Sequence, residues 1–501
     1  MGHLAQKSNT VLSSLAIVNF VGMDKLHIGQ RIELKITDYA FGGKGISKLI
    51  TDKGDKIIFV QNAIPGQRVL ARVVKTKKRY SECKLVKVLQ RAPEEQDTSF
   101  HDIPGAPYAH LPISNQKELK QDSAFGLYRR IGKIENIEDL FDTWIDAPEP
   151  WHYRNKMEYS FSAINSDPLT DTESDRFSLG FKRRGSWWAV ENLNGDSGLF
   201  DAEFESNIKD LRRYFINTGL PAWNPRKREG YYKNLTVRKS FFQDKLLINL
   251  ITGISDESAF DAQAFVDYCR ELFGDRIGGI YHSINKSTGD RSSIEDELMT
   301  LLYGEPVLIE KMHGLEFEIG MRSFFQPNPR CAEKLYAQAL DYVTTGSEIS
   351  KSGTLLDLFC GTGTLAQLLA QKYPEHHIVG VDIEPSAIED ASRNAKRNGI
   401  DKLEFVAGDV GQFLFQHPEL KGKIAAALLD PPRAGIAPKT LRKVIRLEAQ
   451  KLVYISCNPA TQARDCEALA EAGYQLKKLS FADQFPHTSH VEAVGLFEKM
   501  N

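Results

Sequence analysis

The sequence predicts a mixed α/β protein in three parts: a small β-barrel at the front, a central α+β domain, and a C-terminal domain built on a doubly wound parallel sheet. Three observations carry this prediction. Short strands separated by turn residues fill positions 24–91, and helices alternate with buried strands from Leu335 onward. The length of 501 residues suits two to four domains.

The composition is that of a globular chain, with 42% hydrophobic and 26% charged residues and a net charge of −2. It excludes a mostly disordered or collagen-like chain. The longest apolar run, 11–21, is shorter than the ~18 to 20 residues of a membrane helix. The six cysteines form no CxxC pair, so neither a zinc site nor a disulfide framework is expected. We therefore expect a cytoplasmic monomer without a membrane partner.

The front of the chain is divided into an N-terminal extension at 1–22 and a barrel at 23–91. Within 24–91, 16 Lys and Arg residues stand against 6 Asp and Glu residues, which gives this segment a charge of +10. About five strands in so short a segment predict a barrel of the OB type. Its basic charge favours contacts with a phosphate backbone, although lysines that only keep the domain soluble remain the alternative.

Residues 92–320 are predicted to form the central α+β domain. Its segments 151–161 and 180–188 mix aromatic and basic residues. Such side chains can stack on unpaired bases, or they can form the buried face of a sheet, and the sequence leaves both open. We expect a hairpin at 235–251, a helix at 261–273 and a surface loop at 165–175.

Residues 321–501 show the βα alternation of a doubly wound sheet. Gly361 and Gly363 follow its first strand and allow a tight turn and a close approach to a ligand. Asp382 ends the second strand, where it can hold a pair of ribose hydroxyls. The third glycine of an NAD fingerprint is replaced by Ala366, which is tolerated. These residues alone therefore leave NAD and S-adenosylmethionine both open.

Further candidates follow the later strands. Asp409 follows the third strand and can reach an adenine amino group. Asp430-Pro431-Pro432-Arg433 ends the fourth strand, and such a tetrapeptide there is typical of methyltransferases that act on planar amines and bases. Cys457 follows the fifth strand, either as a nucleophile or as a small buried hydrophobe. Glu492 precedes the last strand, either as a buried base or as an exposed ion-pairing residue.

Together these motifs closely resemble the RNA uridine-5-methyltransferases of the RumA and TrmA type. The front segment resembles a TRAM domain, an OB-like RNA-binding barrel. The matching stretches are "SFFQPN", "LDLFCGTGTLA", "GVDIEPSAIEDASRNAKRN", "LLDPPRAGI", "YISCNPATQARD" and "HVEAVGLFEK". The resemblance implies a Rossmann-like S-adenosylmethionine (SAM) methyltransferase domain, with Cys457 as nucleophile and Glu492 as base.

The resemblance also implies six cofactor contacts. The glycine-rich turn after the first strand adds Gly361 as a seventh. The six residues are Gln326, Phe359, Thr364, Asp382, Asp409 and Asp430. Thr364 stands where many family members have asparagine. The family chemistry explains the residue types: a thiolate that adds to carbon 6 of uracil makes carbon 5 reactive, and a carboxylate then removes the surplus proton. The target base must leave its stack to reach such a cleft.

The chain departs from the family pattern in one segment. Many members hold an iron–sulfur cluster with a Cys…CGGC pattern. Here the corresponding positions fall near Asp97 and on Ile103 and Ala106. Because cysteine thiolates hold such clusters, we predict no iron–sulfur cluster and no metal.

The preferred reading is a methyltransferase acting on uridine in ribosomal RNA, most simply 23S rRNA, because RumA-type members carry a TRAM domain and bacterial TrmA-type enzymes lack it. A tRNA thymidine-loop methyltransferase is the first alternative. A catalytically silent RNA-binding protein is the second, and the intact Cys457 and Glu492 argue against it. An NAD-dependent enzyme is disfavoured by Cys457 and by the loop at 430–432.

Overall fold

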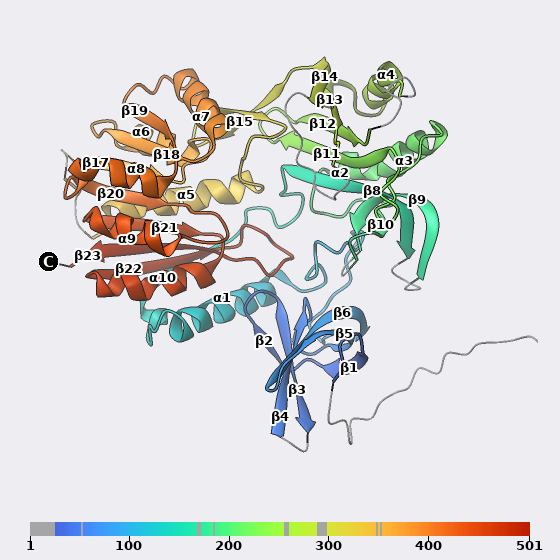
Figure 1. Cartoon of the computed structure of the whole chain (residues 1–501), viewed down its shortest axis with the longest axis horizontal. Helices are drawn as coiled ribbons and strands as arrows, with labels where there is room; N and C mark the ends of the chain where they lie inside the picture. Colours follow the sequence, from blue (N-terminus) through green and yellow to red (C-terminus); the bar gives the residue numbers. More distant parts are fainter. Residues whose placement is uncertain are drawn as a thin grey trace, which may run out of the picture. The chain divides into compact units, whose positions relative to one another are not determined.

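The computed structural model describes residues 26–51, 54–167, 172–183, 186–254, 260–287, 298–346, 349–350 and 353–500. The chain divides into two compact units, Met1–Pro93 and Glu94–Asn501. Figure 1 shows the elements of both units in the colours of the sequence. The predicted extension at 1–22 lies outside the described residues. Within the described ranges, no helix has both the length and the apolarity needed to cross a membrane.

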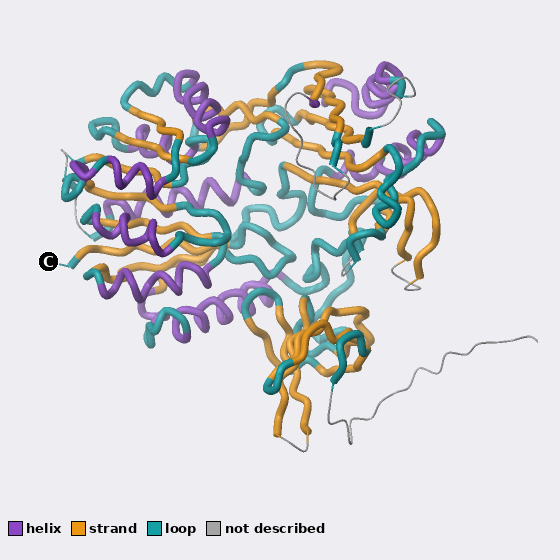
Figure 2. The backbone as a smooth tube through the Cα atoms, viewed as in Figure 1, coloured by secondary structure: helices purple, strands orange, loops and turns teal. Residues whose placement is uncertain are grey.

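The first unit is a single six-stranded sheet around its own apolar core, drawn as orange strands in Figure 2. Along β5, Val69, Ala71 and Val73 are buried while Arg68 and Arg72 are exposed, which is the alternation of a half-buried strand. The sheet has one strand more than the five expected, the three-residue β2. The strands, in spatial order, are β1 (Arg31–Lys35), β5 (Arg68–Thr76), β6 (Tyr80–Gln90), β4 (Gly54–Gln61), β3 (Lys44–Thr51) and β2 (Asp38–Ala40).

A seven-stranded sheet forms the centre of the second unit. Helices α2 (Ala202–Ser206), α3 (Ile208–Asn217) and α4 (Ala262–Phe273) contribute apolar side chains to the core on one face of this sheet. On β8 and β11 the opposite face carries polar side chains, among them Glu158 and Thr236, whereas on β12 and β13 it also carries the apolar Leu247 and Tyr281. The strands, in spatial order, are β10 (Val190–Asn192), β9 (Thr172–Lys182), β8 (Lys156–Asp167), β11 (Tyr232–Ser240), β12 (Lys245–Thr252), β13 (Ile277–Ile284) and β14 (Met299–Gly304).

The surface loop expected at 165–175 is wrong for most of its length. β8 continues to Asp167 and β9 begins at Thr172, and the two strands pair out to these residues. Residues 172–176 of β9 are all exposed, whereas Ile164 and Ser166 of β8 are buried. Backbone hydrogen bonds build the hairpin there, and the sequence lacks the apolar alternation that would have shown it.

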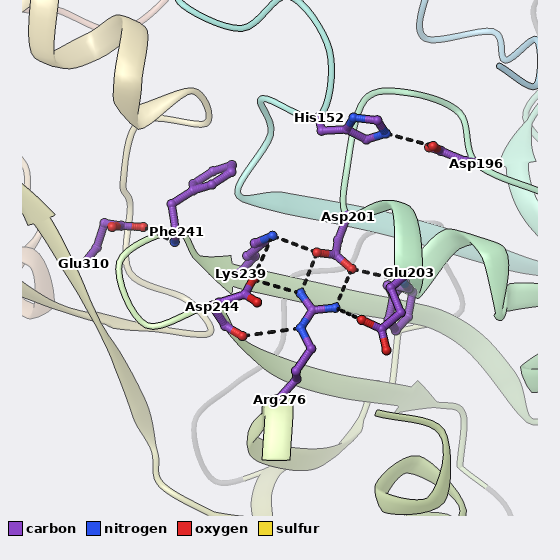
Figure 3. Close-up of polar contacts among 10 residues, drawn as sticks. His152, Asp196, Asp201, Glu203, Lys239, Phe241, Asp244, Arg276 and Glu310 are labelled. Atoms are coloured by element: carbon purple, nitrogen blue, oxygen red, sulfur yellow. Dashed lines mark hydrogen bonds and ion pairs between the residues drawn. The ribbon is translucent and has the colours of Figure 1, made fainter. Parts of the chain in front are cut away.

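An ionic network ties three elements of this central region together (Figure 3). Asp201 caps α2 and accepts hydrogen bonds from Lys239 of β11 and from Arg276, at 2.8 and 2.6 Å. Asp244 joins Lys239 and Arg276 from the β11–β12 turn. Burial alone would raise the pKa of Asp201, but the hydrogen bonds from Arg276 and Lys239 outweigh it and hold that pKa well below its usual value.

An eight-stranded sheet forms the C-terminal part. Its order is β19, β18, β17, β20, β21, β23, β22 and β7, in which β19 to β21 are parallel and β23 is antiparallel to both neighbours. This confirms the doubly wound fold. The strands are β17 (Thr354–Leu358), β18 (Ile378–Asp382), β19 (Leu403–Ala407), β20 (Ile424–Leu429), β21 (Lys451–Ser456), β22 (Tyr474–Ala482) and β23 (Glu492–Lys499). The helices are α5 (Pro329–Thr344), α6 (Thr364–Lys372), α7 (Pro385–Arg397), α8 (Val410–Gln416), α9 (Pro438–Arg446) and α10 (Pro459–Glu471). A separate hairpin, β15 (Val307–Met312) and β16 (Leu315–Gly320), packs against this core.

The predicted central domain at 92–320 is not one contiguous piece. β7 (Phe141–Ile145) is the edge strand of the C-terminal sheet, parallel to β22, and α1 (Ile113–Arg130) packs beside α10. Aromatic packing holds α1 and β7 on the C-terminal sheet. The ring centres of Phe125 and Phe141 lie 5.3 Å apart, and both rings contact Phe481.

Apolar packing holds the segment around Ile103 and Ala106, where the sequence predicts no iron–sulfur cluster. Ile103 and Ala106 are 7% and 6% exposed and belong to the apolar core that includes Phe200. Across the described part of the chain, no group of three or more His, Cys, Asp or Glu side chains could hold a metal ion.

Candidate active site

A cleft of about 1380 Å³ opens at the carboxyl ends of the parallel strands, where ligands bind in doubly wound sheets. The polar face of the central sheet supplies its opposite wall through Lys156, Glu158 and Thr236. All nine residues singled out in the sequence line this one cleft. They are Gln326, Phe359, Gly361, Thr364, Asp382, Asp409, Asp430, Cys457 and Glu492.

The turn between β17 and α6 lines the cleft and contains residues with positive φ values. Phe359 has a φ of 71°, a left-handed conformation that costs a side-chain-bearing residue free energy and often marks a functional site. Gly363 also has a positive φ, and an added Cβ there would meet the Phe405 ring at 2.5 Å. At Gly361 an added Cβ would meet nothing closer than a Phe324 carbon at 4.0 Å. The backbone at Gly361 is therefore open to a ligand in the cleft.

Asp382 and Asp409 are held by backbone groups. Asp382 accepts hydrogen bonds from the amides of Gly361 and Glu384, each at 2.9 Å. Asp409 caps α8 by accepting from the Gln412 amide at 2.8 Å. Both carboxylates thus stand at fixed positions on neighbouring strand ends.

Gln326 lies in a chain of amide and hydroxyl groups. It donates to the Tyr336 hydroxyl at 3.0 Å and accepts from the Gln484 side chain at 3.3 Å. Asn155 donates to its backbone carbonyl. Thr364 is the first residue of α6 and is 8% exposed.

Three carboxyl groups at the bottom of the cleft have raised pKa values. Burial raises the pKa of Asp430 to about 7. Burial, and then the charge of Asp430, raise the pKa of Glu492 to about 8 against the opposing effect of Arg433. Burial followed by Asp430 also raises that of Asp357. A cluster of acids in this state favours a cationic ligand.

Asp357 was not assigned by the sequence reasoning, although it lies inside the "LDLFCGTG" stretch. It is fully buried in β17 and lines the cleft. The sequence did contain a signal for Asp357, because it lies between leucines in a buried strand. A buried carboxyl group needs a functional or structural partner.

Cys457 differs from the other five cysteines. It is half-buried, whereas they are buried. It follows β21 in a turn where Asn458 donates to the Arg433 carbonyl at 3.2 Å. Burial, then the charges of Glu492 and Asp430, raise the pKa of the Cys457 thiol to about 11, and Arg433 opposes them. The thiol therefore has access to the cleft and is mostly protonated at neutral pH.

Glu492 is 6% exposed, so the buried interpretation is the correct one. Lys120 of α1 holds the loop that precedes Glu492. Lys120 and Asp483 form a fully buried ion pair at 2.7 Å, and Lys120 also donates to the Phe485 carbonyl at 3.1 Å. Trp151 stacks on His487 with ring centres 3.5 Å apart. These contacts fix the path of the chain into β23 and hence the place of Glu492.

Comparisons with known proteins identify the family of this chain. The family model for tRNA (uracil-5-)-methyltransferase matches residues 303–500, and the TRAM domain model matches residues 25–86. An "Uncharacterized RNA methyltransferase" of Clostridium tetani is 33% identical over 477 residues, which cover 94% of this chain and 98% of the relative. The chain belongs to the RNA uracil-5-methyltransferase family.

Other comparisons agree with this family. An RNA methyltransferase of Caldanaerobacter subterraneus is 34% identical over 475 residues, with 94% of this chain and 99% of the relative covered. The crystal structure of Pyrococcus abyssi tRNA (uracil-54, C5)-methyltransferase with S-adenosyl-L-homocysteine superposes with a TM-score of 0.68 at 23% identity. That match covers 93% of this chain and 99% of the archaeal chain and shows a shared fold.

This family member is therefore an RNA methyltransferase, and SAM is the cofactor expected of it. Its cleft fits the cofactor. The open backbone at Gly361 leaves space, and Asp382 and Asp409 can accept hydrogen bonds from hydroxyl and amino groups. The acidic floor suits the positive sulfonium.

Proposed function

We propose that this enzyme methylates carbon 5 of uridine in RNA through a covalent bond between Cys457 and the base. The observation that carries the proposal is the shared cleft: a half-buried cysteine and a buried glutamate line the same cavity as the acidic and glycine residues suited to the cofactor. A silent binding protein has no need of this combination.

The chain's own residues perform the steps around the methyl transfer. The Cys457 thiolate adds to carbon 6 of uracil, a carbon–sulfur bond forms, and the electron pair of the carbon 5–carbon 6 double bond moves into the ring as an enolate. When bound, SAM supplies the electrophilic methyl group that carbon 5 takes up. The Glu492 carboxylate then removes the proton from carbon 5. The double bond returns and the thiolate leaves.

We propose the cofactor contacts in the same cleft. Asp382 receives the ribose hydroxyls, Asp409 the adenine amino group, and Gly361 offers open backbone beside them. Gln326, Phe359, Thr364 and Asp430 complete the site. The left-handed Phe359 holds its ring and the following turn in a fixed relation to β17.

We propose ribosomal RNA as the substrate, with the basic barrel at 23–91 and the central region within 92–320 binding the RNA and residues 321–501 forming the methyltransferase domain. The enzyme acts in this proposal as a cytoplasmic monomer without a metal or an iron–sulfur cluster. The support is the TRAM match at 25–86 and the charge of +10 over 24–91.

A tRNA substrate is the second candidate, and two observations favour it. The matching family model is described as a tRNA methyltransferase. The archaeal structure is that of a tRNA enzyme, and a match over 93% of this chain must include most of residues 1–93. An N-terminal unit of this kind therefore does not separate the two substrates.

Nucleoside mass spectrometry of rRNA and tRNA from cells lacking the gene tests both candidates. We expect 5-methyluridine to disappear from rRNA and to return with the wild-type gene but not with Cys457→Ala. Loss from tRNA alone would replace the rRNA proposal by the tRNA one. Unchanged levels in both would contradict uridine methylation.

A further inference from the structure

The two segments that mix aromatic and basic residues occupy different environments. In 151–161, Tyr153, Tyr159 and Phe161 are buried and Trp151 stacks on His487. In the second segment Trp187 is 53% exposed, although tryptophan is usually well buried. The base-stacking interpretation therefore applies to Trp187 and its neighbours, and the first segment serves packing.

Trp187 lines a small pocket outside the catalytic cleft, at the β8–β9–β10 edge of the central sheet. Three tryptophans and two lysines line it together with side chains of β8. These are Trp187, Trp188, Trp223, Lys182, Lys233 and Ser162. Flat aromatic walls beside ammonium groups are the usual setting for a stacked nucleobase with its phosphate close by.

One wall of this pocket is rigid. The Trp188 indole donates to Glu173 at 3.0 Å, and the Arg226 guanidinium lies 4.8 Å from the centre of the Trp188 ring. Arg226 also pairs with Glu173 at 2.7 Å. Trp187 stands at 90° to Trp188 with ring centres 5.7 Å apart. A stacking partner thus meets a preformed corner, which lowers the entropy lost on binding.

The pocket and the catalytic cleft lie on the same face of the central sheet. β8 and β11 pair side by side (Figure 1), with Glu158 opposite Thr236 and Ser160 opposite Asn234. The first pair lines the cleft and the second lines the pocket. Residues two apart on a strand are about 7 Å apart, so the two sites adjoin.

Polar contacts make this face continuous. The Asn234 side chain donates to Glu158 at 3.2 Å and to Ser160 at 3.4 Å. Lys156 lies at the cleft end of the same row. From Lys156 to Ser162 the row spans about 20 Å. Lys156 and Glu158 line the cleft, whereas Ser160 and Ser162 are buried, so RNA meets this row at its cleft end. Glu158 carries a negative charge, so this part of the row suits the edges of bases rather than phosphates.

We propose that an unpaired nucleotide of the RNA substrate, a few positions from the methylated uridine, binds on the exposed face of Trp187 at the mouth of the Trp187–Trp188 pocket. The base stacks on Trp187 against the corner formed with Trp188, and the partly exposed Lys182 lines the same pocket. Lys233 is buried and holds the wall from behind by donating to the carbonyls of Asn285 and Ser287. This inference rests on the proposed function, since it adds a second contact to the RNA that enters the cleft.

The test compares affinities of the full chain for a single-stranded oligouridylate of twelve residues, with S-adenosylhomocysteine present. We expect Trp187→Ala to raise the dissociation constant about tenfold, because one base–aromatic stack is lost. Phe242→Ala is the matched control: Phe242 is 51% exposed and lies under Lys311, yet it lines neither the pocket nor the cleft. The control and the affinity for S-adenosylhomocysteine should not change.

Cross-linking gives a second measurement that needs no variant. The same oligonucleotide carrying one 5-iodouridine, irradiated on the wild-type enzyme, should attach to the peptide that holds Trp187 and Trp188. Equal affinities for wild type and Trp187→Ala, an equal loss in Phe242→Ala, or cross-links confined to the cleft would overturn the inference alone. A wild-type enzyme that binds no oligouridylate would overturn it and also count against the proposed function.

Discussion

At the residue scale, burial and two neighbouring carboxylates, Glu492 and Asp430, hinder ionisation of the Cys457 thiol. Glu492 contributes to the raised pKa of the Cys457 thiol, after burial and together with Asp430. Burial and Asp430 hold the Glu492 pKa near 8. At neutral pH both groups are therefore mostly protonated, and an arriving cation lowers both pKa values. The Cys457 thiol of the empty cleft is therefore expected to react slowly with electrophiles at neutral pH.

This coupling predicts how fast iodoacetamide alkylates Cys457, because only the thiolate reacts. At pH 9 wild-type Glu492 is charged and holds the thiol pKa near 11, whereas Glu492→Gln removes that charge. We expect alkylation of the variant to be faster by up to about tenfold at pH 9, one pKa unit. At pH 6 Glu492 is already neutral, so the two proteins should react alike.

Mass spectrometry of the Cys457 peptide measures this rate free of the five buried cysteines. The exposed Glu471 on α10 provides the control variant Glu471→Gln, which should match the wild type at both pH values. Equal rates for wild type and Glu492→Gln at pH 9 would show that Glu492 does not act on the thiol.

At the element scale, α1 fixes the loop that leads into Glu492. Lys120 and Asp483 are both buried, so removing one partner strands the other charge. We expect Lys120→Met to lower the free energy of unfolding by about 3 to 5 kcal/mol. We also expect it to lower kcat while the affinity for S-adenosylhomocysteine stays the same, because Glu492 shifts and the cofactor contacts do not. Denaturant unfolding and methylation assays measure the two effects.

Lys117, on the same helix, is the matched control. It is partly exposed and lies 3.6 Å from Asp146, a surface pair worth at most about 1 kcal/mol. Lys117→Met should leave kcat unchanged. A Lys120→Met enzyme with full stability and full kcat would show that this ion pair does not position the loop.

Local signals made some elements predictable. α7 begins at Pro385 and ends at Arg397, and both bounds carry a local signal, because proline starts a helix and the Asn398-Gly399 pair ends it. The β17–α6 turn and Asp382 also followed from residue types with fixed backbone demands. The place of β7 in the C-terminal sheet was not predicted, because its partner strand β22 lies more than 300 residues away. The residues Phe141–Ile145 carry no local signal for that pairing.

The same distinction holds within the site. Asp382, Asp409, Asp430 and Cys457 could be named because each ends or follows a parallel strand at the carboxyl edge, where topology gathers such residues. Gln326, Phe359 and Thr364 could be named only from the family resemblance. The burial of Glu492 could not be read from its neighbours, since it depends on Lys120, Trp151 and the distant elements that carry them.

At the scale of the whole molecule, the net positive charge lies in residues 24–91, within the first compact unit. This unit has an apolar core of its own. We expect a chain of residues 94–501 to bind S-adenosylhomocysteine normally. Its affinity for RNA should fall tenfold or more, with a shallower dependence on salt, because fewer phosphates are neutralised. Titrations at several salt concentrations measure both changes.

A charge reversal in the full chain separates lost charge from lost structure. Lys77 and Lys78 are exposed on the loop before β6, so Lys77→Glu with Lys78→Glu should flatten the salt dependence without unfolding the barrel. RNA affinity and salt dependence that survive both changes would place the phosphate contacts elsewhere.

The central claim is that Cys457 forms a bond to uracil and that Glu492 is needed to release it. The most direct measurement incubates Glu492→Gln with SAM and RNA from cells lacking the gene, followed by denaturing electrophoresis. The account predicts an RNA–protein adduct that survives denaturation, maps to Cys457 by mass spectrometry and is absent from Glu492→Gln with Cys457→Ala. A Cys457→Ala enzyme that still forms 5-methyluridine, with no adduct in Glu492→Gln, would contradict it.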